Sequence, residues 1–149
     1  MGKSYKNRMT IEFEGFDEVI AKMYKLEGNV KETTERGLKK THEIITAKAQ
    51  EAVQKPNLPA KGRYSTGTTE KMLKTDADVY WEGTVAKVPV GFKIHKHDGL
   101  PSLFMIYGTP RYMKNQKMYN AFWSSKTHNE VIEAQKEIFY EELRKLEGL

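Results

Sequence analysis

Apolar and polar residues alternate at the start of the chain. Met9, Ile11 and Phe13 are separated by polar residues over positions 9–13. A period of two is expected when one face of a strand is buried and the other faces water. The pattern therefore predicts a first strand that ends at Gly15.

A helical period follows at once, with apolar positions three or four residues apart. These positions are Val19, Ile20, Met23 and Leu26. Asp17 is placed to accept hydrogen bonds from the amides of the first turn. Gly28 is placed to supply the left-handed residue that ends a helix. The segment predicts a short amphipathic helix.

A long polar helix is predicted from Asn29 to about Gln54, a stretch without proline. Its narrow buried stripe is Val30, Leu38, Thr41, Ile45, Ala49 and Ala52. Gly37 either weakens this helix by about 1 kcal/mol relative to alanine or marks a close approach of backbone. Pro56 and Pro59 then end the helix.

Residues 55–75 are rich in Gly, Pro, Ser and Thr and predict an extended loop. Residues 78–82 and 84–91 then alternate around Gly83, which predicts two strands joined by a tight turn, with Trp81 in the core. Pro89 favours an edge position or a short second strand.

The remainder of the chain predicts two further elements. The apolar run Leu103–Tyr107 fits either a strand or the start of a helix. Thr127 and Glu130 have the spacing of a capping box, and a C-terminal helix of about five turns follows. Its apolar stripe is Val131, Ile132, Ile138, Phe139, Leu143 and Leu146.

This order of elements predicts one α+β domain over residues 1–149. A small antiparallel sheet is expected, with the long helix and the C-terminal helix packed on one of its faces. No apolar run approaches the roughly 18 residues that span a bilayer, so we expect no membrane contact and a cytoplasmic location.

The formal net charge of +5 is unevenly distributed. Residues 55–75 hold five basic residues and one acidic residue, and residues 87–117 hold six basic residues and one acidic residue. Residues 130–149 instead hold six glutamates against three basic residues. Such asymmetry suits either nucleic-acid binding or opposite faces that meet in a homo-oligomer.

Candidate chemistry is sparse. The chain has no cysteine, which excludes disulfides and thiolate chemistry. His95 and His97 could join His42 or His128 around a metal, but histidines in a polar segment are usually solvated. Gly62 and Gly67 lack the lysine of a phosphate-binding loop. We therefore expect no cofactor and no enzymatic activity.

The basic segments nevertheless contain aromatic residues, a combination that suits contact with proteins or nucleic acid. Our candidate interface residues are Lys61, Arg63, Tyr64, Arg111, Tyr112, Lys114, Lys117 and Tyr119. We expect residues 55–75 and 92–119 to reach neighbouring proteins, because both are basic, contain glycine and look unsuited to a core. The alternative is a nucleic-acid-binding module that uses the same basic residues.

The order of features resembles a known family. The opening IEFEGFDEVIAKMYKL is followed by a long polar helix, a proline loop with Thr66-Gly67, a valine-rich strand pair, Gly108-Thr109 and a closing helix. This order, over nearly the whole chain, is similar to that of the gene-product-10-like tail-completion proteins of long-tailed bacteriophages and prophages, which are also described as minor tail or head–tail joining proteins.

The resemblance implies a structural subunit of the virion neck, assembled in the cytoplasm of the host bacterium. Such a subunit completes the tail before the tail joins the DNA-filled head, as part of a ring of identical copies. It would contact neighbouring neck and tail proteins and, in passing, phage DNA. A ring built head to tail could pair Lys114 and Lys117 of one copy with the acidic C-terminal helix of the next.

Overall fold

The computed structural model describes residues 13–53, 71–93, 100–110 and 113–148. Its elements are α1 (Phe16–Lys25), α2 (Val30–Ala52), β1 (Tyr80–Glu82), β2 (Val85–Lys87), α4 (Leu100–Tyr107), α5 (Gln116–Trp123) and α6 (Ser125–Leu146). Residues 9–12 of the predicted first strand lie outside the described part, as do Pro56 and Pro59. The predicted end of that strand, residues 13–15, is wrong, because these residues form a turn that leads into α1.

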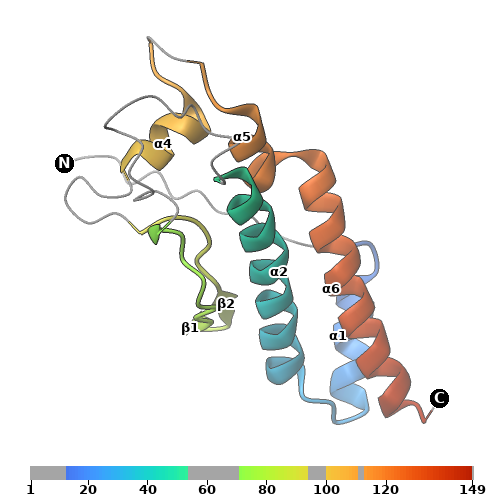
Figure 1. Ribbon diagram of the computed structural model, residues 1–149. Helices are drawn as coiled ribbons and strands as arrows, with labels where there is room; N and C mark the ends of the chain where they lie inside the picture. The colour runs from blue at the N-terminus through green and yellow to red at the C-terminus, as the bar shows by residue number, and fades with distance from the viewer. Residues whose placement is uncertain (1–12, 54–70, 94–99, 111–112, 149) are drawn as a thin grey trace.

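The helices and the two-stranded antiparallel sheet form a small α+β fold. The two long helices, α2 and α6, run antiparallel along the length of the molecule (Figure 1). α1 packs against α6 on one flank of α2, and the β1–β2 hairpin lies on the other flank (Figure 1). α4 and α5 lie at the end of the molecule where α2 ends and α6 begins (Figure 1).

The predicted helix α1 is confirmed, but its two ends are built differently from the prediction. Gly15, with φ 82°, is the N-cap, and Asp17 lies within the first turn. The left-handed residue after the helix is Glu27, with φ 59°, rather than Gly28. A Cβ on Gly28 would lie 2.4 Å from Cδ1 of Leu146, so Gly28 lies where the Leu146 side chain of α6 comes close.

Gly37 marks a close approach of α2 to α6. A Cβ on this residue would lie 2.2 Å from Oε1 of Gln135. The buried Gln135 side chain uses this space to donate a 2.6 Å hydrogen bond to Oγ1 of Thr41. Thr41 in turn donates to the carbonyl of Gly37 over 3.0 Å. Of the two interpretations of Gly37, close approach is therefore correct, with a side chain rather than backbone as the neighbour.

Helix α6 begins before the predicted capping box. Ser124 is the N-cap, and its side chain accepts a 3.1 Å hydrogen bond from the amide of Thr127. The predicted role of Thr127 as the cap is wrong, because its buried hydroxyl instead donates to the carbonyl of Asn120 over 2.8 Å. This hydrogen bond ties the end of α5 to the first turn of α6.

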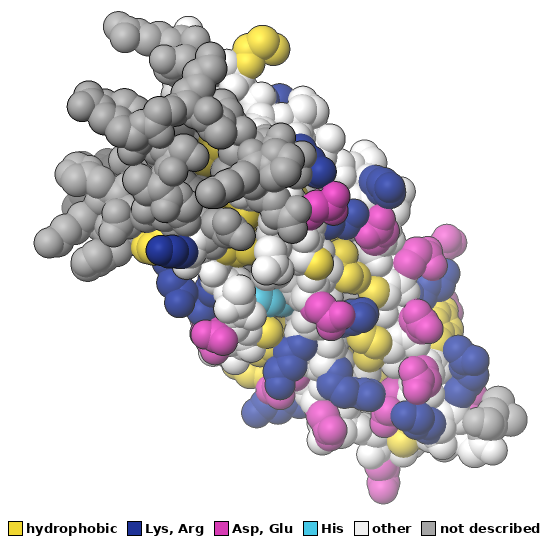
Figure 2. Space-filling view, viewed as in Figure 1, with side chains coloured by type: hydrophobic (Ala, Val, Ile, Leu, Met, Phe, Trp, Pro, Cys, Tyr) yellow, Lys and Arg dark blue, Asp and Glu magenta, His cyan; other side chains and the backbone are white. Residues whose placement is uncertain are grey.

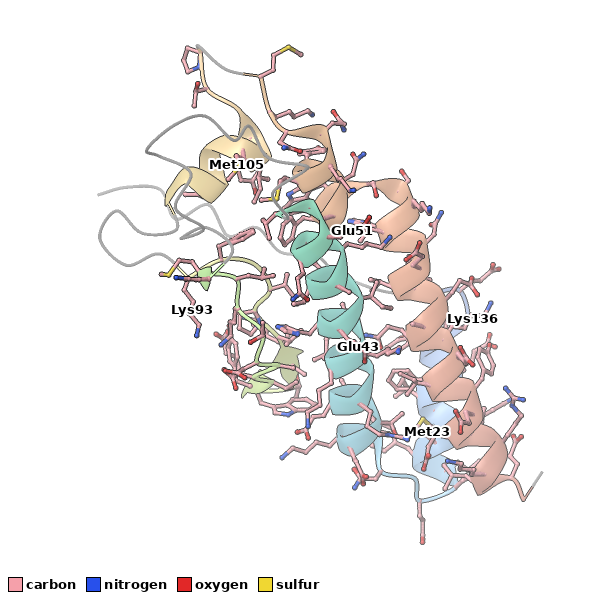
Figure 3. The ribbon with its side chains drawn as sticks, in the orientation of Figure 1. Met23, Glu43, Glu51, Lys93, Met105 and Lys136 are labelled. Carbon is pink, nitrogen blue, oxygen red and sulfur yellow. The ribbon has the colours of Figure 1, made fainter. Side chains whose placement is uncertain are left out.

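Two apolar clusters stabilise the helical body. The first joins α1 to α6 and consists of Phe13, Val19, Met23, Phe139 and Leu143. The second joins α2, α4, α5 and α6, and its buried members are Ile45, Ala49, Ala52, Val53, Leu73, Ile106, Met118, Ala121, Phe122 and Val131. The labelled Met23 and Met105 mark the two ends of the body in Figure 3.

Residues 72–93 form a long hairpin, which we call the ribbon. At its tip β1 pairs with β2, with Trp81 opposite Ala86. At its base the backbone amide of Lys74 donates to the carbonyl of Gly91 over 2.8 Å, and the backbone amide of Lys93 donates to the carbonyl of Met72 over 2.7 Å. The predicted strand pair is thus confirmed, with strands shorter than expected.

Parts of the two segments expected to reach neighbouring proteins are instead core. Leu73 is 6% exposed and joins the second cluster, although it falls inside the predicted loop 55–75. Ile106 and Met118 are 6% and 0% exposed, within the segment 92–119. The apolar run 103–107 lies in helix α4, and the next helix, α5, was not predicted from the sequence. Ile106 and Met118 therefore pack inward from two short helices.

Candidate interaction surfaces

The structure places three of the eight candidate interface residues. Lys61, Arg63, Tyr64, Arg111 and Tyr112 lie outside the described residues. Lys114 lies just before α5, and Lys117 and Tyr119 lie in its first turn. The helix begins where the side chain of Asn115 accepts a hydrogen bond from the amide of Met118.

All three of these residues make contacts within their own chain. Nζ of Lys114 lies 3.8 Å from the centre of the Tyr119 ring, a cation–π contact. Nζ of Lys117 lies 3.2 Å from Oε1 of Glu51 at the end of α2. Tyr119 is half-buried and packs on the second apolar cluster. The Tyr119 ring therefore contributes to the apolar packing and also makes the cation–π contact with Lys114.

Other basic residues of the middle segments are also paired. Lys74 lies 2.7 Å from Oδ2 of Asp78, and Lys87 bonds to Glu82 across the ribbon. Asp78 has a lowered pKa, because Lys74 donates a hydrogen bond to it and also attracts its negative charge. These carboxylates offset part of the positive charge that the sequence suggested was available to nucleic acid.

The histidines that could have bound a metal lie apart or outside the described residues. His42 is 2% exposed, and its Nδ1 lies 3.3 Å from Oγ1 of Thr46. His128 is on α6, and His95 and His97 are not described. Within the described ranges no three metal-ligating side chains come together.

His42 is instead a buried base beneath the ribbon. Burial lowers its pKa first, because an apolar site disfavours the charged imidazolium, and the nearby charge of Lys74 lowers it further. The negative charges of Asp78 and Asp76, and a hydrogen bond from the ring to the backbone carbonyl of Lys74, raise the pKa and so act in the opposite direction. The net effect is that the folded protein disfavours the charged imidazolium of His42.

We expect the protein to lose stability as the pH falls below about 6.5, the ordinary pKa of histidine. The unfolded chain then takes up a proton that folded His42 resists, so the loss continues down to the lowered pKa of the folded state. Urea unfolding between pH 8 and pH 5 measures it. His42→Gln should flatten the dependence over this interval, and an unchanged slope in that variant would contradict the assignment.

Contacts at the base, at the middle and near the tip hold the ribbon against α2. Leu73 packs into the second cluster at its base, and His42 lies beneath its middle. Near the tip, Nε1 of Trp81 donates a 2.8 Å hydrogen bond to Glu35, and Nζ of Lys31 lies 5.8 Å from the Trp81 ring centre. Trp81 is thus half-buried against α2. The prediction that Trp81 lies in the core is wrong.

Exposed large apolar side chains occur at three separate places in the described residues. Tyr24 and Leu26 lie at the end of α1, Tyr80 and Val85 lie on the ribbon, and Leu103, Tyr107 and Met113 lie on and beyond α4. Figure 2 shows other apolar atoms scattered among charged side chains on the α2 face. Three separate apolar surfaces suit a protein with more than one neighbour.

The outer row of the ribbon was not among the predicted interface residues. Asp76, Asp78, Tyr80 and Glu82 are exposed, and the residues between them are half-buried. In the sequence, Asp76 and Asp78 lie two residues apart, which is the spacing of one strand face. The sequence could not show which face of the ribbon the helices would cover.

Comparison with protein-family models, curated protein sequences and solved structures finds no match for this chain. Among the described residues, no helix combines the length and the apolar character needed to cross a membrane.

Proposed function

We propose that this chain is a structural subunit of the neck of a long-tailed bacteriophage or prophage. It completes the tail and takes part in head–tail joining as one copy in a ring. The observation that carries this proposal is the presence of three exposed apolar surfaces on separate parts of one helical body. A subunit inside a ring needs a surface for each adjacent copy and a third for the next protein along the axis.

The order of elements supports the same proposal. A short helix, a long polar helix, a strand pair and a closing helix follow one another in the structure, as they do in the family that the sequence resembles. The α4 end, with Leu103, Tyr107 and Met113, is the surface that we assign to a neck or tail protein. The site of action is the virion, after assembly in the bacterial cytoplasm, with passing contact with DNA.

The experiment that tests this function uses the parent phage or prophage with a stop codon in place of Tyr24. Electron microscopy of the particles should show filled heads apart from tails, or joined particles with defective necks. Supply of the intact chain from a plasmid should restore normal virions. Normal infectious virions without that supply would overturn the proposal, and salt-sensitive binding of the purified chain to random duplex DNA would then favour the nucleic-acid alternative.

Reversal of two cations tests whether the α5 surface takes part in assembly. Lys117→Glu with Lys114→Glu removes an exposed ion pair and a cation–π contact. We expect a loss of about 1 kcal/mol or less in the free energy of unfolding. If this surface contacts a neighbour, the loss of association should exceed that small effect, as measured by sedimentation.

The matched control for this reversal is Lys117→Glu with Glu51→Lys, which restores the ion pair inside the chain. Recovery of folding without recovery of association would locate Lys117 at an interface. Full recovery of both, or unchanged assembly in the reversed variant, would show that this lysine only stabilises its own chain.

A further inference from the structure

The base of the ribbon is anchored in the core. Leu73 is a buried member of the second cluster, and Val90 and Phe92 pack against that cluster. Leu73 also pairs with Phe92 in an isolated antiparallel bridge, and the ring centre of Phe92 lies 6.3 Å from that of Phe122 on α5. From this base the ribbon runs along α2 to the β1–β2 tip (Figure 1). The base is thus fixed to the helical body.

The rest of the ribbon is held more weakly. Residues 74–89 include no fully buried side chain, although they cover His42 of α2, which is itself buried. At the tip, Trp81 is half-buried and makes a hydrogen bond to Glu35 and a cation–π contact with Lys31. An element that buries little apolar surface and is held by a few polar contacts opens more readily than the core. We call residues 74–89 the flap.

The hydrogen bonds of His42 in the closed structure fit a neutral ring. The ring donates to the backbone carbonyl of Lys74 at the start of the flap. Its Nδ1 lies 3.3 Å from Oγ1 of Thr46, one turn along α2. A neutral imidazole has one donor and one acceptor nitrogen, so it can donate to the carbonyl and accept from the hydroxyl. A second ring proton removes that acceptor.

The charges that act on this ring come from the flap. Burial lowers the pKa of His42 most, and the positive charge of Lys74 lowers it further. The negative charges of Asp78 and Asp76 raise it, as does the hydrogen bond to the backbone carbonyl. Two exposed cations also lie on the neighbouring backbone, Lys39 one turn earlier on α2 and Lys93 at the ribbon base. Movement of the flap therefore changes both the burial and the charge around His42.

We propose that the flap is a proton-sensitive device, which closes on α2 over a neutral His42 and turns away about the ribbon base when that imidazole takes up a proton. In the open state water solvates the ring, so its pKa returns toward the ordinary value of 6.5. The open state therefore binds the proton more tightly, and acid favours opening below about pH 6.5. The device goes beyond the proposed neck function and does not depend on it.

Amide exchange measures this opening even when the open fraction is small. A two-stranded hairpin alone is marginally stable, so the amides of residues 80–87 lose protection once the flap leaves α2. After correction for the intrinsic effect of pH on exchange, their protection should fall by up to about tenfold between pH 8 and pH 5.5. They should also exchange faster than the amides of α6 at every pH. Equal protection of the hairpin and α6, or no pH effect on the hairpin, would overturn the proposal.

Histidine variants assign the effect to one ring. His42→Gln should remove the pH dependence of hairpin protection, because glutamine donates and accepts hydrogen bonds but does not titrate. The chain has four histidines, and the matched control changes the other three in one chain: His95→Gln, His97→Gln and His128→Gln. This control should keep the full pH dependence, and it decides the question if the His42 variant does not fold. Dependence that persists in His42→Gln, or that is lost in the control, would refute the assignment.

Tryptophan fluorescence gives a second, independent test. The chain has two tryptophans, and Trp123→Phe leaves Trp81 in the flap as the single one. Glu35→Ala in the same chain removes the hydrogen bond at the tip and so raises the open fraction. From pH 8 to pH 5.5, the emission of Trp81 should shift to longer wavelength and its quenching by acrylamide should increase. Far-UV circular dichroism should stay constant. Unchanged emission, or a change that appears only as the helices unfold, would count against the flap.

Discussion

Replacing Phe139 with alanine should lower the free energy of unfolding by about 3–5 kcal/mol. Phe139 is 1% exposed and lies at the centre of the cluster that joins α1 to α6. Its ring centre is 5.3 Å from that of Phe16 in an edge-to-face contact and 6.2 Å from that of Phe13. Removal of the ring therefore removes both aromatic contacts and leaves a cavity between the helices. Urea unfolding with far-UV circular dichroism measures the loss.

The control for this substitution is Phe139→Leu, which keeps most of the apolar volume and should cost clearly less than alanine. A loss of under about 1 kcal/mol for alanine would contradict the central role of this ring. The substitution also tests the packing of α1, because Val19 and Met23 of α1 share a cluster with Phe139. If α1 loosens, amide exchange in α1 should rise more than in α2.

Replacing Gly37 with leucine should cost about 2–6 kcal/mol in the free energy of unfolding. Even a Cβ at this position would lie 2.2 Å from Oε1 of Gln135. A larger side chain must displace the buried amide, break its 2.6 Å hydrogen bond to Thr41 and force α2 away from α6. Overpacking of this kind costs about 1–3 kcal/mol, and an unsatisfied buried polar group adds about 1–3 kcal/mol.

A smaller pair of substitutions isolates the steric cause. In a Gln135→Ala background the space beside position 37 is empty, so Gly37→Ala should gain up to about 1 kcal/mol from helix propensity. In the natural background the same change should gain less or lose stability. Equal effects in the two backgrounds would show that Gln135 does not restrict position 37.

The hydrophobic periodicity of the sequence predicted the longer helices and the hairpin. The stripes of α1, α2 and α6 were visible because each repeats over several turns, and Val19, Met23, Ile45, Val131 and Phe139 are buried as expected. The hairpin around Gly83, with φ 64°, was visible from alternation around a turn residue. These signals are local, because they depend on the geometry of one helix or one strand.

Short elements were harder to predict. The run 103–107 is apolar throughout, so it has no period that separates strand from helix. Helix α5 has only 8 residues and mixes polar with aromatic positions. Its place is determined by the cap at Asn115 and by burial of Met118 at 0% exposure. The candidate interface was affected in the same way, since nothing in the sequence indicated that Lys117 would meet Glu51.

Composition and repeats along the chain were enough to predict the long helices, the hairpin, the α+β class and the lack of cysteine chemistry. Only the folded chain shows the partners of Gly37, Lys117 and Trp81, and the exposed faces that remain for other molecules. Such contacts join residues far apart in sequence. Burial and charge at a given residue depend on which distant element packs against it.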